Sequence, residues 1–83
     1  MLEAFIVESK VGCFLHQDWS ADPAAAAKLL RARVSLGKGL RSEWGRVIRF
    51  DGRDAEVVGG FGAYPDAVDP RSLLGVAGKG GAA

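Results

Sequence analysis

Cys13 and His16 are the residues best suited by type to covalent chemistry, because a thiolate is a nucleophile and an imidazole is a general base. The chain has one cysteine and one histidine, and both belong to a region rich in strand-forming residues. Residues three apart on a strand point to opposite faces of the sheet. The spacing therefore argues against a thiol enzyme. It favours Cys13 as a small core residue and His16 as a surface residue at a strand end.

Metal and phosphate sites are also disfavoured by the residue types. A structural zinc site usually takes about four histidine or cysteine ligands, which this chain cannot supply. Gly37-Lys38 lacks the rest of a phosphate-binding loop, since Ala32 and Gly39 stand where that motif needs a glycine and a serine or threonine. Asp51 and Asp54 flank a predicted turn, which aspartates commonly close. We therefore expect no metal, no cofactor and no enzymatic activity.

The basic residues are concentrated between Lys28 and Arg53. Eight of the eleven lie in this basic segment with only two acids, so its formal charge is +6, whereas the whole chain carries +1. Such polarisation can steer a molecule of opposite charge onto one face. Arg46 is expected at the rim of the core, with its charged head in water. The predicted partner-binding residues are Lys28, Arg31, Lys38, Arg41, Arg49 and, as either an aromatic anchor or a helix staple, Trp19.

A first hairpin is predicted before the basic segment. Apolar and β-branched runs at residues 3–7 and 11–15 predict its two strands, and the polar residues 8–10 between them predict its turn. Gly12 then falls inside the second strand, where a glycine is typical of a bulge or of a close backbone approach.

A helix is predicted from Pro23 to Leu36. Asp22 is a favourable N-cap, and proline suits the first helical position because its missing N–H has no partner there. The alanines that follow have high helix propensity, and Gly37 is a natural end. The apolar face of this helix is expected to cover a sheet, while Lys28 and Arg31 project into solvent.

A second hairpin is predicted around a four-residue loop at residues 51–54. This loop places Arg49 opposite Glu56, which is a favourable cross-strand charge pair. A two-residue loop at residues 51–52 keeps the same faces but loses that pair, so we choose the longer loop. The predicted apolar face, which the helix is expected to cover, pairs Trp44 with Phe61, Ile48 with Val57, and Phe50 with Ala55.

These elements predict an α+β fold. One domain, residues 1–74, contains a small antiparallel sheet of about four strands in ββαββ order, covered by one main amphipathic helix. A short C-terminal helix is expected after Asp69, with Pro70 at its first position. Residues 75–83 are rich in glycine and alanine and are expected to form a flexible tail.

Length and composition are those of a small globular protein. The chain has 83 residues, of which 48% are hydrophobic and 25% charged, so there is room for one domain. The apolar runs are too short to span a bilayer and no secretory leader is recognisable, so we expect no membrane association and a cytoplasmic location. The single cysteine fits a reducing compartment. The sequence leaves open whether the protein is a monomer or a dimer.

In size and layout the chain resembles small phage-encoded accessory proteins of the anti-CRISPR type. The resemblance covers residues 2–64 and consists of the helix that begins Asp22-Pro23-Ala24-Ala25-Ala26-Ala27, laid on an antiparallel sheet. That group shares no sequence motif, so no functional residue carries over. The resemblance implies a non-enzymatic, stoichiometric inhibitor of a nucleic-acid-handling complex such as a CRISPR-Cas effector, acting in the host cytoplasm.

The expected partner is therefore a protein complex with an acidic or nucleic-acid-binding surface. Two alternatives remain at this point. One is a small nucleic-acid-binding domain that uses the basic segment to contact DNA or RNA directly. The other is a small accessory subunit of a larger complex.

Overall fold

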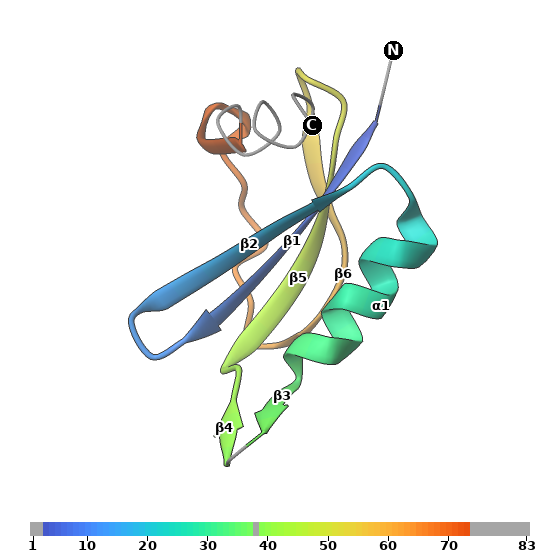
Figure 1. Cartoon of the computed structure of the whole chain (residues 1–83). Coiled ribbons are helices and arrows are strands. Elements are labelled where there is room, and N and C mark those ends of the chain that lie inside the picture. The colour runs from blue at the N-terminus through green and yellow to red at the C-terminus, as the bar shows by residue number, and fades with distance from the viewer. Residues whose placement is uncertain (1–2, 38, 74–83) are drawn as a thin grey trace.

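Two antiparallel hairpins, joined through the first strand of each, form the central sheet of the computed structural model, which describes residues 3–37 and 39–73 (Figure 1). The strand order in this four-stranded sheet is β2-β1-β5-β6. β1 and β5 are central, whereas β2 and β6 form the two edges. The strands are β1 (Ala4–Val11), β2 (Phe14–Ser20), β5 (Trp44–Phe50) and β6 (Ala55–Gly62).

The remaining elements are one helix, a short ribbon and a single 3-10 turn. Helix α1 (Pro23–Arg33) follows the first hairpin, and β3 (Ser35–Gly37) pairs with β4 (Leu40–Arg41) in a two-stranded ribbon. The 3-10 turn η1 (Pro70–Leu73) lies where a short C-terminal helix was predicted. The predicted α+β class and four-stranded antiparallel sheet are confirmed. The ββαββ order is wrong, because the ribbon adds two strands between the helix and the second hairpin.

The first hairpin turns at a different place from the one predicted. β1 continues through the polar residues 8–10, and the turn lies at Gly12 and Cys13, between Val11 and its partner Phe14. Gly12 has a φ of 60°, a conformation that glycine adopts without steric cost. The predicted turn and the predicted bulge at Gly12 are therefore both wrong.

Helix α1 begins where the sequence predicted and ends earlier. The Asp22 side chain accepts a hydrogen bond from the backbone N–H of Ala24 at 3.1 Å, and Pro23 takes the first helical position. The helix ends at Arg33 instead of Leu36, because residues from Ser35 onward pair with β4. Its buried residue is Ala26, and Leu29 and Leu30 pack against the sheet beside it.

The second hairpin has the predicted loop but an irregular register. Arg49 faces Glu56 and Phe50 faces Ala55, as the four-residue loop required. The register then shifts between Val47 and Ile48, so that Val58 is an extra residue in β6. Past this bulge the predicted Trp44–Phe61 pair is wrong, because Trp44 faces Gly62.

The bulge also moves Phe61 to the other face of the sheet. Phe61 now lies over Gly45, where an added Cβ would come within 2.5 Å of the Phe61 ring and 3.0 Å of Leu30. Gly45 therefore provides the space in which Phe61 packs beside α1. A larger residue there would displace the ring.

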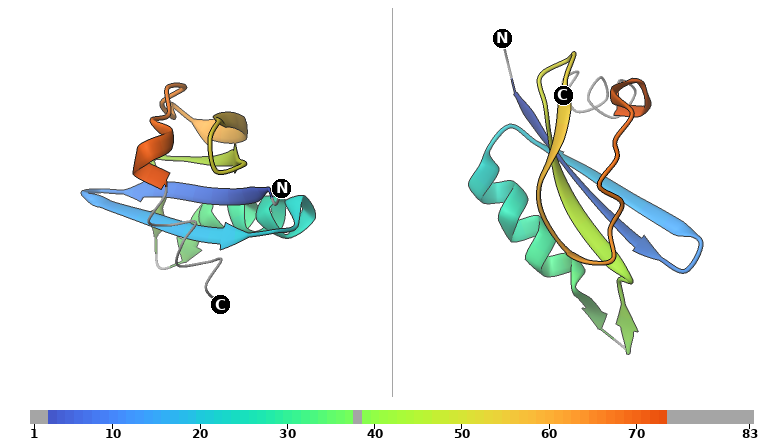
Figure 2. Two further views of the ribbon diagram at one scale, coloured as in Figure 1. Left: turned by 90° about the horizontal axis from the view of Figure 1, so that it is seen from above. Right: turned by 180° about the vertical axis from the view of Figure 1, so that it is seen from behind.

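Both faces of the sheet are covered, each by a different part of the chain (Figure 2). Helix α1 covers a helix-side cluster, and the segment that leads to η1 covers the opposite cluster. The helix was predicted to cover the face with Ile48 and Phe50, and that prediction is wrong. The helix-side cluster consists of Phe5, Val7, Ala26 and Val47, and the opposite cluster consists of Ile6, Ile48, Phe50 and Leu73.

The described residues belong to one compact body. The element contacts link α1 to β1, β2 and β5, and the Cα radius of gyration is 12.2 Å. The predicted flexible tail, residues 75–83, and residue 74 at the end of the predicted domain lie outside the described residues.

Candidate functional site

The two residues best suited to covalent chemistry lie on the outside of the first hairpin. Cys13 is exposed in the β1–β2 turn, so its prediction as a core residue is wrong. His16 is also exposed and lies opposite Ser9 near the middle of β2. Gly37 belongs to β3, and Lys38 lies outside the described residues.

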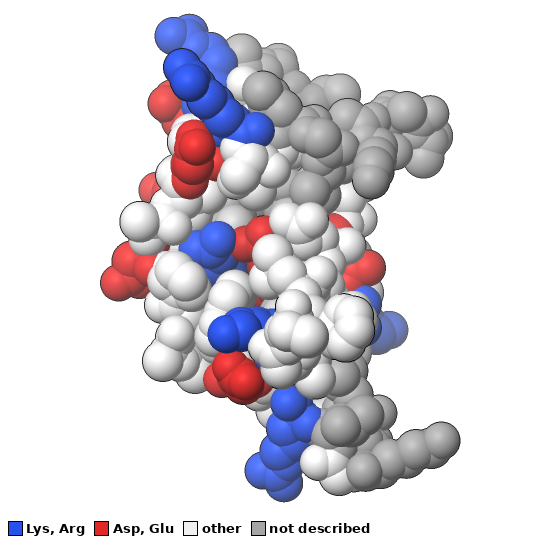
Figure 3. Space-filling model, turned by 90° about the vertical axis from the view of Figure 1, so that its left-hand side faces the viewer, with Lys and Arg blue, Asp and Glu red and all other residues white. Residues whose placement is uncertain are grey.

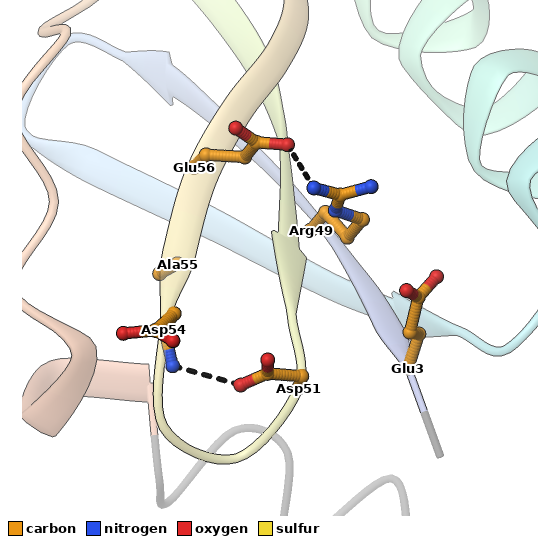
Figure 4. A pocket seen from close by; sticks show the side chains of 6 residues that line it. All are labelled: Glu3, Arg49, Asp51, Asp54, Ala55 and Glu56. Carbon is orange, nitrogen blue, oxygen red and sulfur yellow. Dashed lines mark hydrogen bonds and ion pairs between the residues drawn. The ribbon is translucent and has the colours of Figure 1, made fainter. Parts of the chain in front are cut away.

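A polar pocket lies at the other end of the molecule, around the β5–β6 loop (Figure 4). Its volume is about 330 Å³, and one arginine is surrounded by carboxylates. Arg49 and Glu56 point toward each other and form an ion pair. Because both side chains are about half exposed, such a pair contributes little to stability. The lining residues are Glu3, Arg49, Asp51, Asp54, Ala55 and Glu56.

Asp51 closes the loop beneath this pocket. Its Oδ1 accepts hydrogen bonds from the backbone N–H groups of Arg53 and Asp54, both at 2.8 Å. These bonds favour the ionised form, first from Asp54 and then from Arg53, and lower the pKa of Asp51 below its ordinary 3.8. The aspartate holds the turn, as the sequence predicted for this residue type.

We expect the Asp51 carboxyl carbon to titrate with a midpoint below 3.8 in an NMR pH series. Because the pKa is lowered by folding, the stabilising contribution of Asp51 is present above the unfolded pKa and is lost as the pH falls through the folded pKa. A midpoint at or above the ordinary value would show that the two N–H bonds are not maintained in solution. Asp51→Asn is the control, because it should remove this titration while leaving a side-chain oxygen to close the turn.

A buried ion pair joins three strands to the C-terminal segment. Arg46 donates from Nε to Glu8 Oε1 at 2.7 Å and from Nη1 to the carbonyl oxygens of Pro65 and Ala67, at 2.7 and 3.2 Å. Gln17 on β2 donates to the other Glu8 oxygen at 2.7 Å. The prediction that Arg46 lies at the rim with its head in water is wrong. The Arg46 guanidinium links β1 and β5 to the C-terminal segment.

The basic segment does not form one continuous patch. Three of its arginines are paired with carboxylates: Arg33 with Asp18, Arg46 with Glu8, and Arg49 with Glu56. On the face shown in Figure 3, Lys and Arg side chains are scattered among Asp and Glu from one end to the other. Arg49, a predicted partner-binding residue, lies in the acidic pocket, where it is paired with Glu56.

Three exposed basic side chains lie on α1 and on the ribbon that follows it. Lys28 and Arg31 are exposed and lie three residues apart on the same face of α1. Ser35 pairs with the exposed Arg41 across the β3–β4 ribbon. Within the described part of the chain none of these three cations forms an ion pair. We call Lys28, Arg31 and Arg41 the basic row.

Trp19 does not belong to this row. It lies on the sheet face opposite α1, half-buried against the cluster of Ile6, Ile48, Phe50 and Leu73. Its indole Nε1 is buried and has no hydrogen-bond partner among the described residues. Because Trp19 lies on the face away from α1, it does not staple the helix, and its ring is partly covered by the core on that face. Its contact with a partner stays a prediction.

Comparisons with known proteins leave the chain without a relative. The sequence matches no protein-family model, and searches of curated proteins and of solved structures find no significant match. The described residues contain no group of three or more metal-ligating side chains placed to hold an ion. Among the helices of the described ranges, none is both long and apolar enough to cross a membrane. The basic row is therefore interpreted from its geometry alone.

The outer part of β2 is the surface that sequence reasoning missed. Phe14 and Leu15 were predicted only as residues of the second strand, and they are 69% and 51% exposed. Gly12 supplied the available signal, because a glycine at that position permits a two-residue turn and so moves both residues onto a projecting edge strand.

Proposed function

We propose that the protein is a non-enzymatic, protein-binding module that inhibits a nucleic-acid-handling complex by occupying an acidic surface on it. The observation that carries this proposal is the basic row, because Lys28, Arg31 and Arg41 are exposed along α1 and the ribbon without a carboxylate partner in the described part of the chain. The resemblance in layout to anti-CRISPR proteins supports the inhibitory mode. The proposed place of action is the cytoplasm of a host cell.

Direct binding to nucleic acid is the second candidate, and the same basic row favours it. A protein that neutralises about three phosphates is expected to show a salt slope of only about −3, which corresponds to weak, non-specific binding at physiological salt. The near-neutral net charge of the whole chain lowers its expected affinity for nucleic acid further. An acidic protein surface with matching shape adds apolar and hydrogen-bonding contacts that bare phosphate does not, so we favour the protein partner.

The test compares two charge-reversed variants. Arg31→Glu/Arg41→Glu reverses two members of the basic row, and Arg53→Glu/Arg71→Glu reverses two exposed arginines elsewhere with the same change in net charge. In pull-downs from host lysate followed by mass spectrometry, we expect a partner that the wild type and the second variant retain and the first loses. With that partner purified, its affinity for the first variant should fall at least about tenfold, because like charges facing each other across an interface are strongly unfavourable.

The outcomes separate the two candidates. Equal loss in both variants, or no loss in either, would contradict the basic row as the interface. Absence of a protein partner, together with salt-sensitive binding of the wild type to a fluorescent DNA or RNA oligonucleotide, would transfer the function to the second candidate. Circular dichroism of both variants provides the check that the fold is unchanged.

A further inference from the structure

β2 is a regular edge strand with an unoccupied outer side. It pairs with β1 over seven consecutive residue pairs without a register shift, and no other described element pairs with its outer edge. It contains no proline and no bulge, two of the features that commonly protect an edge from pairing with another chain, and its one acidic side chain, Asp18, is already paired with Arg33. The hairpin that carries it projects beyond the helix and the second hairpin (Figure 1).

The backbone groups on this outer side follow from the turn. A two-residue hairpin closes on a hydrogen-bonded pair, here Val11 and Phe14, and such pairs alternate along the ladder. The backbone groups of His16 and Asp18 therefore point toward β1. Those of Leu15, Gln17 and Trp19 point outward, where a second strand can reach them.

The side chains of β2 are complementary to a second copy of themselves. In an antiparallel pairing centred on Gln17, each Leu15 faces Trp19 of the other copy, and each His16 faces Asp18. His16 is exposed, and an imidazole N–H can donate to the Asp18 carboxylate on the α1 side of the sheet. The Arg33 guanidinium already holds Oδ2 of that carboxylate, which leaves Oδ1 to accept.

This pairing also removes apolar surface from water. Leu15 is 51% exposed and Trp19 is half-buried, and both lie on the face opposite α1. Their contact across the new strand pair occurs twice, because a two-fold axis relates the copies. The register that satisfies the outward backbone groups therefore also joins the apolar pair of Leu15 with Trp19 and the hydrogen-bonding pair of His16 with Asp18.

We infer that two copies of this chain associate through β2, antiparallel and centred on Gln17, to form one continuous sheet. Because the axis is perpendicular to the sheet, the two α1 helices lie on the same face. The inference goes beyond the proposed function and does not depend on it. It also decides between the monomer and the dimer that the sequence left open.

The test uses two substitutions at one exposed position. His16→Asp places a carboxylate opposite Asp18 of the other copy, whereas His16→Lys places an ammonium group there that can pair with it. In sedimentation equilibrium over a concentration series, we expect the wild type and His16→Lys to be dimeric. The dissociation constant of His16→Asp should rise about tenfold or more, because the like-charge pair occurs twice in each dimer.

Hydrogen exchange of single amides checks the register. Protection of Leu15, Gln17 and Trp19 should increase with protein concentration, while protection of the inward amides of β2 should not change. A monomer at all concentrations would overturn the inference, even if a strand of another protein binds this edge. Equal effects of both His16 substitutions would overturn it too. Arg31→Glu/Arg41→Glu should dimerise like the wild type, so failure of the proposed function leaves this result unaffected.

Discussion

Arg46→Met is expected to lower the free energy of unfolding by about 3–5 kcal/mol, because it leaves the Glu8 carboxylate buried without a counter-charge. Glu8 is only 3% exposed, and Arg46 supplies both its ion pair and two bonds to carbonyl oxygens of the C-terminal segment. The substitution also removes the contact between the guanidinium and Trp44, which lie 5.6 Å apart. Urea unfolding followed by far-UV circular dichroism measures the change.

A second variant distinguishes the effect of the uncompensated Glu8 charge from the effect of lost packing around Arg46. Glu8→Met/Arg46→Met removes both charges and should be clearly more stable than Arg46→Met alone, since an apolar pair of similar volume can replace a buried ion pair. If Arg46→Met unfolds at the same urea concentration as the wild type, Arg46 does not hold the segment in solution. If the double variant is less stable than the single one, the uncompensated charge is not the cause.

Phe50→Ala is expected to cost about 3–5 kcal/mol, the range for deleting a buried aromatic side chain. Phe50 is 2% exposed and is the largest fully buried side chain among the described residues. It packs with Ile6, Ile48 and Leu73, so the cavity would form where η1 covers the sheet. Urea unfolding gives the stability, and hydrogen exchange of the amides of residues 71–73 should show earlier opening of the segment.

Phe14→Ala is the matched control for this substitution. The chemical change is the same, but Phe14 is 69% exposed at the hairpin tip. At a protein concentration below the dissociation constant of the proposed dimer, its effect should stay within about 0.5 kcal/mol. Similar losses in the two variants would contradict the assignment of Phe50 to the core.

Features set by neighbouring residues were predictable from the sequence. The start of α1 follows from Asp22 and Pro23, and the turn before η1 follows from Asp69, whose Oδ1 accepts from the Arg71 N–H at 3.0 Å. The loop at residues 51–54 follows from its turn-forming residues and from the charge pair of Arg49 with Glu56. Each depends on contacts within a few residues, which local propensity describes well.

Features set by distant residues were not predictable. Residues 8–10 resemble a turn because Glu8 is charged, yet its partner Arg46 lies 38 positions away and makes burial acceptable. The bulge at Val58 reverses which side chains of β6 face each side of the sheet. No single residue in the sequence indicates this bulge. The sequence also gave no sign that residues 63–73 cover one face, so the helix was placed on the wrong side of Ile48.

Only part of the candidate interface was predictable, because the rest depends on residues that are distant in the sequence. Exposure of Lys28, Arg31 and Arg41 follows from their place on α1 and the ribbon. The pairing of Arg49 with Glu56 was expected from the loop at residues 51–54. Trp19 is partly covered because it shares the sheet face of Ile6, its partner across the hairpin.

The bulge in β6 determines how far assembly through sheet edges can proceed. β6 is the other edge of the sheet, but its ladder is interrupted at Val58 and it ends at Gly62 with a φ of 71°. Such an edge is a poor template for a further strand. Each subunit therefore has one edge strand, β2, that can pair with another copy, so assembly stops at the dimer. Open-ended filaments, which require two complementary ends on every subunit, are not expected even in concentrated solution.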